Sequence, residues 1–204
     1  MTHILKEVNA LFPSKMIHLG GDEVSFGNDK WMADKEVQTL IQQQGIKDVL
    51  GVERYFMRRI ADSVFKMDAK VLAWDEVVDM GLPQDQTIVF WWRHDKPGQL
   101  SRSLNKGYPT VICPRVPFYF DFVQDSTHTM GRKWDGVYNP LKDVYGFDIN
   151  KWPGITSKNK KMVLGIQANV WTETMTNNYR LDYMIYPRIA ALAETAWSSE
   201  EQKL

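Results

Sequence analysis

The chain has 204 residues, of which 44% are hydrophobic, enough apolar material to build the core of one domain. Basic and acidic residues number 25 each, so the formal net charge is zero and nothing favours nucleic acid or an anionic membrane as a partner. No apolar stretch approaches the ~20 residues that cross a bilayer, and the single Cys113 excludes an internal disulfide. We therefore expect one domain over residues 1–204 that binds a neutral ligand, with its cellular compartment left open.

Hydrophobic spacing predicts a strand followed by helices in the first third of the chain. Residues 4–12 have helical spacing that stops at Pro13, and residues 16–20 form a short buried strand. Helices are expected over 34–44 and 49–64. The chain thus begins a strand–helix alternation.

The alternation continues to the end of the chain. Apolar runs predict four more strands, over residues 71–74, 88–92, 110–113 and 163–170. A helix is expected over 98–106, and an amphipathic helix over 181–196 closes the chain with a kink at Pro187. Residues 114–160 are too long for a simple connection and are interpreted as an active-site loop. Alternating strands and helices imply an α/β fold with a parallel sheet.

Two neighbouring carboxylates, Asp22 and Glu23, follow the first strand behind a glycine pair. Adjacent side chains on a regular strand point to opposite faces, so both acids can reach one substrate only where the strand ends or distorts. Gly20 and Gly21 permit that distortion. Taken alone, the tetrapeptide is equally typical of a polar turn that caps the next segment.

The other predicted strands also end in side chains suited to a sugar site. Parallel α/β proteins bind ligands at the carboxyl ends of their strands, so clusters in register favour one shared site over coincidence. The clusters are Asp22 with Glu23, Trp74 with Asp75 and Glu76, Trp91 with Trp92, Tyr119 with Asp121, and Trp171 with Glu173.

The order and spacing of these clusters resemble the glycoside hydrolase family 20 β-N-acetylhexosaminidases. The resemblance implies a (β/α)8 barrel, of which this chain would hold strands four to eight as five parallel strands in one partial catalytic domain. It also implies that the strand supplying a hydroxyl-gripping arginine is missing. The segments that carry the resemblance are His18-Leu19-Gly20-Gly21-Asp22-Glu23-Val24, Ala73-Trp74-Asp75-Glu76, Trp92-Arg93, Tyr119-Phe120-Asp121, Trp171-Thr172-Glu173 and the stretch from Tyr186-Pro187-Arg188 to Glu194.

The resemblance implies hydrolysis of terminal, non-reducing N-acetylhexosamine residues with retention. This family is an exception among retaining glycosidases, because the substrate's own 2-acetamido oxygen is the nucleophile. Glu23 would then be the general acid/base and Asp22 the group that orients the acetamide. No metal and no cofactor is expected.

The remaining site residues are assigned by the same resemblance. Tyr119 would hydrogen-bond the acetamido carbonyl, and Asp121 and Glu173 would hold sugar hydroxyls. Trp74, Trp92 and Trp171 would form the walls of the pocket. Trp91 faces away from its neighbour and is expected to pack between strand and helix, and His18 is expected to be structural.

Two alternative functions stay open. The chain could be an inert half-barrel or a weak binder of N-acetyl sugars, since its arginine is missing. Gly20 to Glu23 also resembles the signature of GGDEF diguanylate cyclases, although few residues precede it and no phosphate-binding basic cluster is present.

A five-strand piece of a barrel leaves two unpaired strand edges, so we expect a homodimer or other self-association. The preference for gluco or galacto sugars is not determined.

Overall fold

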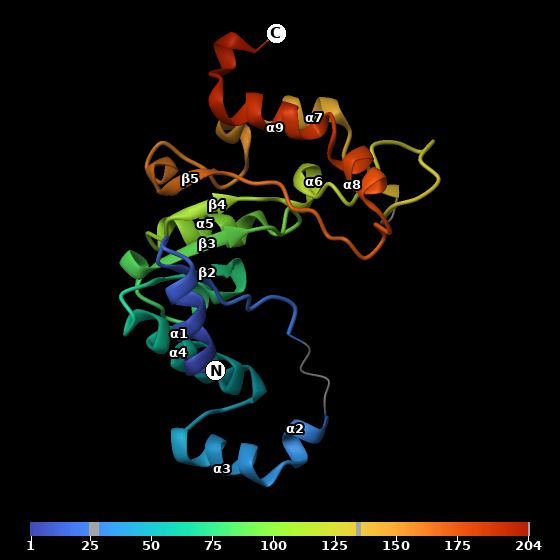
Figure 1. Cartoon of the computed structure of the whole chain (residues 1–204). Coiled ribbons are helices and arrows are strands. Elements are labelled where there is room, and N and C mark those ends of the chain that lie inside the picture. Colours follow the sequence, from blue (N-terminus) through green and yellow to red (C-terminus); the bar gives the residue numbers. More distant parts are fainter. Residues whose placement is uncertain (25–28, 134–135, 204) are drawn as a thin grey trace. The chain divides into compact units, whose positions relative to one another are not determined.

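A computed structural model describes residues 1–24, 29–133 and 136–203 (Figure 1). Five strands form one sheet in the order β1-β2-β3-β4-β5, which confirms the predicted α/β fold. The chain divides into two compact units, Met1–Val89 and Phe90–Leu204. The strands are β1 Met16–His18, β2 Lys70–Trp74, β3 Thr87–Trp91, β4 Thr110–Ile112 and β5 Val163–Ile166.

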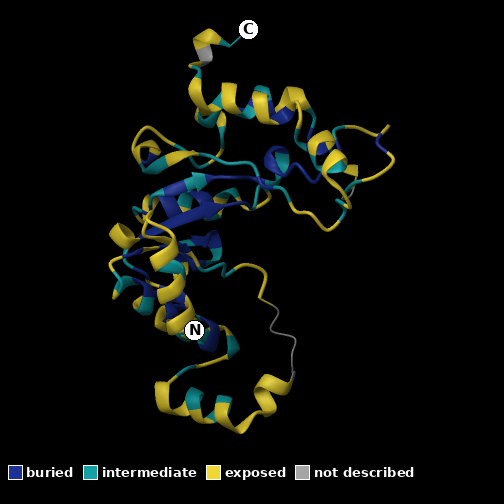
Figure 2. Ribbon diagram, viewed as in Figure 1, coloured by how far each residue is buried: buried dark blue, intermediate teal, exposed yellow. Residues whose placement is uncertain are grey.

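Strand β1 pairs with β2, and β4 with β5, in the parallel sense. Ile17 of β1 lies opposite Val71 of β2, and Ile112 of β4 lies opposite Ile166 of β5. All five residues of β3 are buried, as expected for a strand covered on both faces. Strands β2 and β4 are buried over most of their residues, as the dark blue colour in Figure 2 shows.

In the first unit the predicted helices are confirmed. Asp34 caps α3 by accepting hydrogen bonds from two backbone N–H groups, and Gly45 ends it in the left-handed region with φ 60°. Asp48 caps α4, whose buried face includes Met57 and Val64 and packs on β2. The helices here are α1 Thr2–Leu11, α2 Asp29–Ala33, α3 Lys35–Gln44, α4 Val49–Phe65 and the 3₁₀ helices η1 Asp75–Asp79 and η2 Gln84–Gln86.

The second unit has its core around Trp91, which is fully buried and packs with Leu100, Phe118 and Ala191. The prediction that Trp91 packs between strand and helix is therefore confirmed, and Cys113 is a buried free cysteine. The helices are α5 Pro97–Asn105, α6 Arg115–Phe118, α7 Leu141–Tyr145, α8 Asn178–Ile185, α9 Arg188–Trp197 and the 3₁₀ helices η4 Ile149–Lys151, η5 Lys160–Met162 and η6 Glu200–Gln202.

Three sequence predictions were wrong in detail. Residues 114–160 are not a plain loop, because they contain α6, α7 and η4, and α7 packs against α9 (Figure 1). The closing helix is broken rather than kinked at Pro187: Tyr186 is extended, with φ −89° and ψ 143°. The proline ring disfavours helical backbone at the residue before it, which accounts for the end of α8 at this point. The last strand ends at Ile166 instead of residue 170.

No helix in the described ranges is long and apolar enough to span a bilayer.

Candidate active site

The first unit carries the glycine pair and the two neighbouring acids. After β1 the chain stays beside β2, since the Leu19 N–H donates to the Leu72 carbonyl at 2.8 Å and the Trp74 N–H donates to the Gly20 carbonyl at 3.0 Å. Gly20 and Gly21 then adopt φ values of 73° and 92°. These left-handed conformations end the strand, as the sequence predicted.

Gly21 is also constrained by space. A Cβ at this position would lie 3.1 Å from Met57 Cε and 3.2 Å from Val77 Cγ1. Helix α4 and the 3₁₀ helix η1 therefore close on the turn from two sides and leave room for glycine. This close approach fixes where the chain leaves β1.

Asp22 and Glu23 both lie exposed at this turn. The Asp22 carboxylate folds back, with Oδ1 3.7 Å from the point that a Cβ on Gly20 would occupy. Glu23 adopts φ 48°, a left-handed conformation that is uncommon for a residue with a side chain and clusters at functional sites.

His18 and Trp74 pack beside these acids at the ends of β1 and β2. Their rings meet edge to face, with centroids 5.0 Å apart. His18 Nδ1 accepts a hydrogen bond from the Gly20 N–H at 3.1 Å. Partial desolvation lowers the pKa of His18, while the nearby charge of Asp22 acts in the opposite sense. These contacts fit the structural role expected for His18.

In the second unit three of the predicted aromatic residues come together. Trp92 and Tyr119 are stacked, with centroids 6.4 Å apart and an interplanar angle of 19°. Tyr119 meets Trp171 edge to face at 5.9 Å. Trp92 and Tyr119 are buried, whereas Trp171 is 39% exposed, so it presents ring surface to solvent. Burial raises the pKa of Tyr119 and keeps its phenol neutral.

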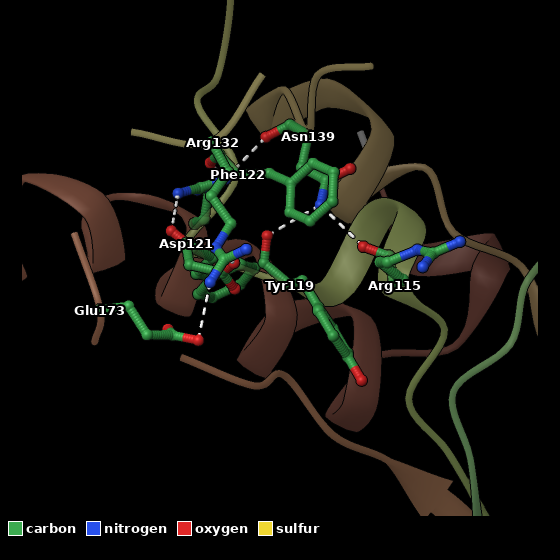
Figure 3. Close-up of polar contacts among 9 residues, drawn as sticks. Arg115, Tyr119, Asp121, Phe122, Arg132, Asn139 and Glu173 are labelled. Atoms are coloured by element: carbon green, nitrogen blue, oxygen red, sulfur yellow. Dashed lines mark hydrogen bonds and ion pairs between the residues drawn. The ribbon is translucent and has the colours of Figure 1, made fainter. Parts of the chain in front are cut away.

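The two predicted hydroxyl-binding carboxylates also meet, and Arg132 joins them (Figure 3). Its Nε lies 3.4 Å from Asp121 Oδ2, and its Nη2 lies 2.7 Å from Glu173 Oε1. Asp121 is 1% exposed, and burial raises its pKa to about 6. Glu173 is exposed, and its pKa is lowered by backbone hydrogen bonding and by Arg132.

Backbone contacts hold the segment that carries Tyr119 and Asp121. Tyr119 bridges Asn169 in the parallel sense, beyond the end of β5. The Phe120 N–H donates to the Asn169 carbonyl at 2.8 Å, and the Asn169 N–H donates to the Phe118 carbonyl at 2.9 Å. Parallel pairing of the backbone therefore continues past the end of β5 to Asn169, as an isolated bridge and not as a further strand.

Two buried polar side chains complete this support. Asn139 Nδ2 donates to the carbonyls of Arg115 and Tyr119, both at 2.8 Å (Figure 3). The fully buried Arg188 donates to the carbonyls of Phe120 at 2.7 Å, Phe122 at 2.9 Å and Asn139 at 3.0 Å. Sequence alone had not indicated either residue as part of the site.

The geometry can be compared with known proteins. The family model of the glycosyl hydrolase family 20 catalytic domain matches residues 1–200. The chain belongs to glycosyl hydrolase family 20. This membership confirms the resemblance seen in the sequence, and it rules against the GGDEF alternative because the match includes Gly20 to Glu23.

Relatives in family 20 are similar along the whole chain. A β-hexosaminidase of Porphyromonas gingivalis is 31% identical over 100% of this chain and 25% of its own length. The human β-hexosaminidase subunit beta is 29% identical over 98% of the chain and 34% of its own length. The chain therefore spans about a quarter to a third of these relatives.

A solved family 20 structure has the same fold. The exo β-N-acetylglucosaminidase from Vibrio harveyi, in complex with N-acetylglucosamine, superposes with a TM-score of 0.88 at 29% identity. It covers 100% of this chain and 31% of that protein. The five parallel strands thus correspond to part of the barrel of a family 20 enzyme, as predicted.

Among the described residues, no group of three or more His, Cys, Asp or Glu side chains is placed to hold a metal ion.

Proposed function

We propose that this chain is the part of a β-N-acetylhexosaminidase that hydrolyses terminal, non-reducing N-acetylhexosamine residues. The observation that carries the proposal is the aromatic and carboxylate cluster of the second unit, in a chain that belongs to family 20. Exposed aromatic ring surface stacks on the apolar faces of sugars, and carboxylates accept hydrogen bonds from their hydroxyls. The balanced charge of the chain fits such a neutral ligand.

Two residues of the first unit would perform the chemistry. Glu23 gives its proton to the glycosidic oxygen while the bond from that oxygen to C1 breaks. The acetamido oxygen of the same sugar forms the new bond to C1, and the positive charge spreads over an oxazolinium ring. Asp22 accepts a hydrogen bond from the acetamide N–H and stabilises that charge. Water then attacks C1 and gives a proton to Glu23, while the bond from C1 to the acetamido oxygen breaks and the acetamide re-forms, so two displacements at C1 retain the configuration.

Other side chains would bind the sugar. Trp74, Trp92 and Trp171 pack against its ring, the Tyr119 hydroxyl donates a hydrogen bond to the acetamido carbonyl, and Asp121 and Glu173 accept hydrogen bonds from its hydroxyls. These assignments are supported by the family match, which covers residues 1–200. We accordingly propose that residues 1–204 act as one catalytic domain.

The first experiment is a chromogenic N-acetylglucosaminide assay on the purified 204-residue chain. Release of the chromophore, proportional to protein and lost in the Glu23→Gln variant, is the expected result. If no chromophore is released but N-acetylglucosamine still binds, the chain is a sugar-binding piece without turnover.

The second experiment tests the acid role of Glu23. Because only poor leaving groups need protonation, Glu23→Gln should lower kcat at least about 100-fold for an alkyl glycoside and much less for a nitrophenyl glycoside. Glu7→Gln, an exposed residue on α1, is the matched control and should leave both rates unchanged. Equal losses on both substrates would contradict the assignment.

Asp22→Asn tests the acetamide contact. This change should lower the rate on both kinds of leaving group, because the contact with the acetamide precedes departure of either. Unchanged turnover would remove the support for assistance by the substrate.

A further inference from the structure

We propose that Arg132 is a substrate-binding residue, which grips the sugar hydroxyls together with Asp121 and Glu173 and sets which hydroxyl pattern is accepted. The proposal rests on the proposed function and adds to it a residue that the sequence did not single out. It starts from the two contacts in Figure 3, where one guanidinium lies against both carboxylates.

The chemistry of hydroxyl groups calls for such a residue. Carboxylates can only accept hydrogen bonds, whereas each sugar hydroxyl donates one and accepts up to two. Asp121 and Glu173 alone would leave the lone pairs of a bound hydroxyl without a donor. A guanidinium carries five N–H donors in a planar fork, so the three side chains together supply both kinds of partner.

Arg132 is held in place by its backbone. Its N–H donates to the Asp121 carbonyl at 3.3 Å, and its carbonyl accepts from the Val123 N–H at 3.1 Å. Gly131 precedes it with φ 115°, and a Cβ there would lie 2.5 Å from Val123 Cγ1. The chain therefore lies so close to the site segment that glycine is needed, and the side chain of Arg132 is only 23% exposed.

Asp121 offers a place for the hydroxyl. Its Oδ2 faces Arg132, while no well-formed hydrogen bond reaches its buried Oδ1 from the described residues, although the backbone N–H groups of Asp121 and Trp171 are close enough to lower the pKa of the carboxyl. A buried acceptor without a partner costs free energy that a ligand donor can recover. Asp121 Oδ2 and Glu173 Oε1 lie 3.4 Å and 2.7 Å from nitrogens of the same guanidinium, so a hydroxyl that donates to either carboxylate would lie beside N–H donors of Arg132.

The test measures binding of N-acetylglucosamine and its 3-, 4- and 6-deoxy analogues to the 204-residue chain by calorimetry. Hydrogen bonds to charged groups contribute enough that Arg132→Gln should weaken N-acetylglucosamine roughly 10- to 100-fold. Arg132→Lys keeps the charge but not the fork, so it should recover part of the loss. Lys133→Gln, which removes an exposed charge from the next residue, is the matched control and should bind as the native chain does.

The deoxy analogues separate contact from mere structural support. In the native chain, removal of the gripped hydroxyl should weaken binding; in Arg132→Gln, the same removal should have little further effect. Equal penalties in both proteins, or native affinity in Arg132→Gln, would overturn the proposal. Arg132→Lys supplies the same comparison if the glutamine variant does not fold.

The outcomes also distinguish this proposal from the proposed function. Binding that depends on Arg132 without turnover would refute hydrolysis and leave the hydroxyl grip standing. If turnover and sugar affinity are the same in the Arg132 variants as in the native chain, the substrate-binding role of Arg132 is refuted and the proposed function is not. If the native chain binds none of these sugars at millimolar concentration, both proposals fall.

Discussion

Replacement of Asp121 by Asn should stabilise the fold near neutral pH while it weakens sugar binding. Asp121 is 1% exposed, and burial raises its pKa from 3.8 to about 6 even though the charge of Arg132 opposes this. In the unfolded chain the carboxyl titrates near its ordinary value. Between these two values the native state binds more protons than the unfolded state, so the free energy of unfolding falls as pH rises.

The size of the effect follows from the two pKa values. One pKa unit corresponds to about 1.4 kcal/mol, so the rise from 3.8 to about 6 corresponds to about 3 kcal/mol. The contribution of Asp121 to the free energy of unfolding is fully present below its pKa in the unfolded chain and is lost as the pH rises through its pKa in the folded chain, about 6. Asn has nearly the same shape and no charge, so Asp121→Asn should exceed the native chain by up to about 3 kcal/mol near pH 7.5 and match it near pH 4.

Urea unfolding of both proteins, followed by tryptophan fluorescence between about pH 4 and about pH 7.5, measures this difference. Subtracting the free energy of unfolding of the native chain from that of Asp121→Asn at each pH removes the contribution of every other titrating group. Asp143→Asn, at an exposed residue on α7, is the control for the loss of one carboxylate from the surface. A difference that stays constant with pH, or that grows toward acid, would refute the reasoning.

Three further predictions concern the fold. Arg188→Met should lower the free energy of unfolding by about 4 kcal/mol, because it leaves three buried carbonyls without a donor; urea titration measures this, and a loss below about 1 kcal/mol would contradict it. Gly131→Ala should cost about 2 kcal/mol and Gly81→Ala, with no atom near its Cβ, about 1 kcal/mol; equal losses in the same titration would contradict the close approach. The 204-residue chain should form dimers or larger species in light scattering, because β1 and β5 end the sheet, and a monomer at all concentrations would refute this.

The sequence predicted the regular elements because their signals are local. The strand at Met16 and the helix after Asp48 each have an apolar pattern of the right period and a cap or turn residue at its boundary. The departure of the chain at Gly20 and Gly21 could be predicted for the same reason, since glycine marks left-handed backbone. Family resemblance then pointed to the site residues, and three of these, Trp92, Tyr119 and Trp171, are in ring contact in the second unit.

What sequence could not predict depends on contacts between distant residues. Arg132 lies in a polar stretch without hydrophobic periodicity. The residues around it do not indicate its ion pair with Glu173, which is 41 residues further along the chain. The helices α6 and α7 were missed because each has only four or five residues, too few for a helical pattern to emerge. Short elements of this kind form because the surrounding core packs them.

Arg188 shows how a helix far along the chain can control the geometry of the sugar site. Residues 120–122 lie outside the named strands, so their buried carbonyls need donors that no sheet ladder supplies. An apolar side chain on α9 could fill the same space but would leave these carbonyls unsatisfied. The guanidinium instead joins Phe120, Phe122 and Asn139, and Asn139 in turn donates to the Tyr119 carbonyl. The positions of Tyr119 and Asp121 are therefore coupled to α9 through hydrogen bonds to the backbone, so substitutions at Arg188 should disturb sugar binding as well as stability.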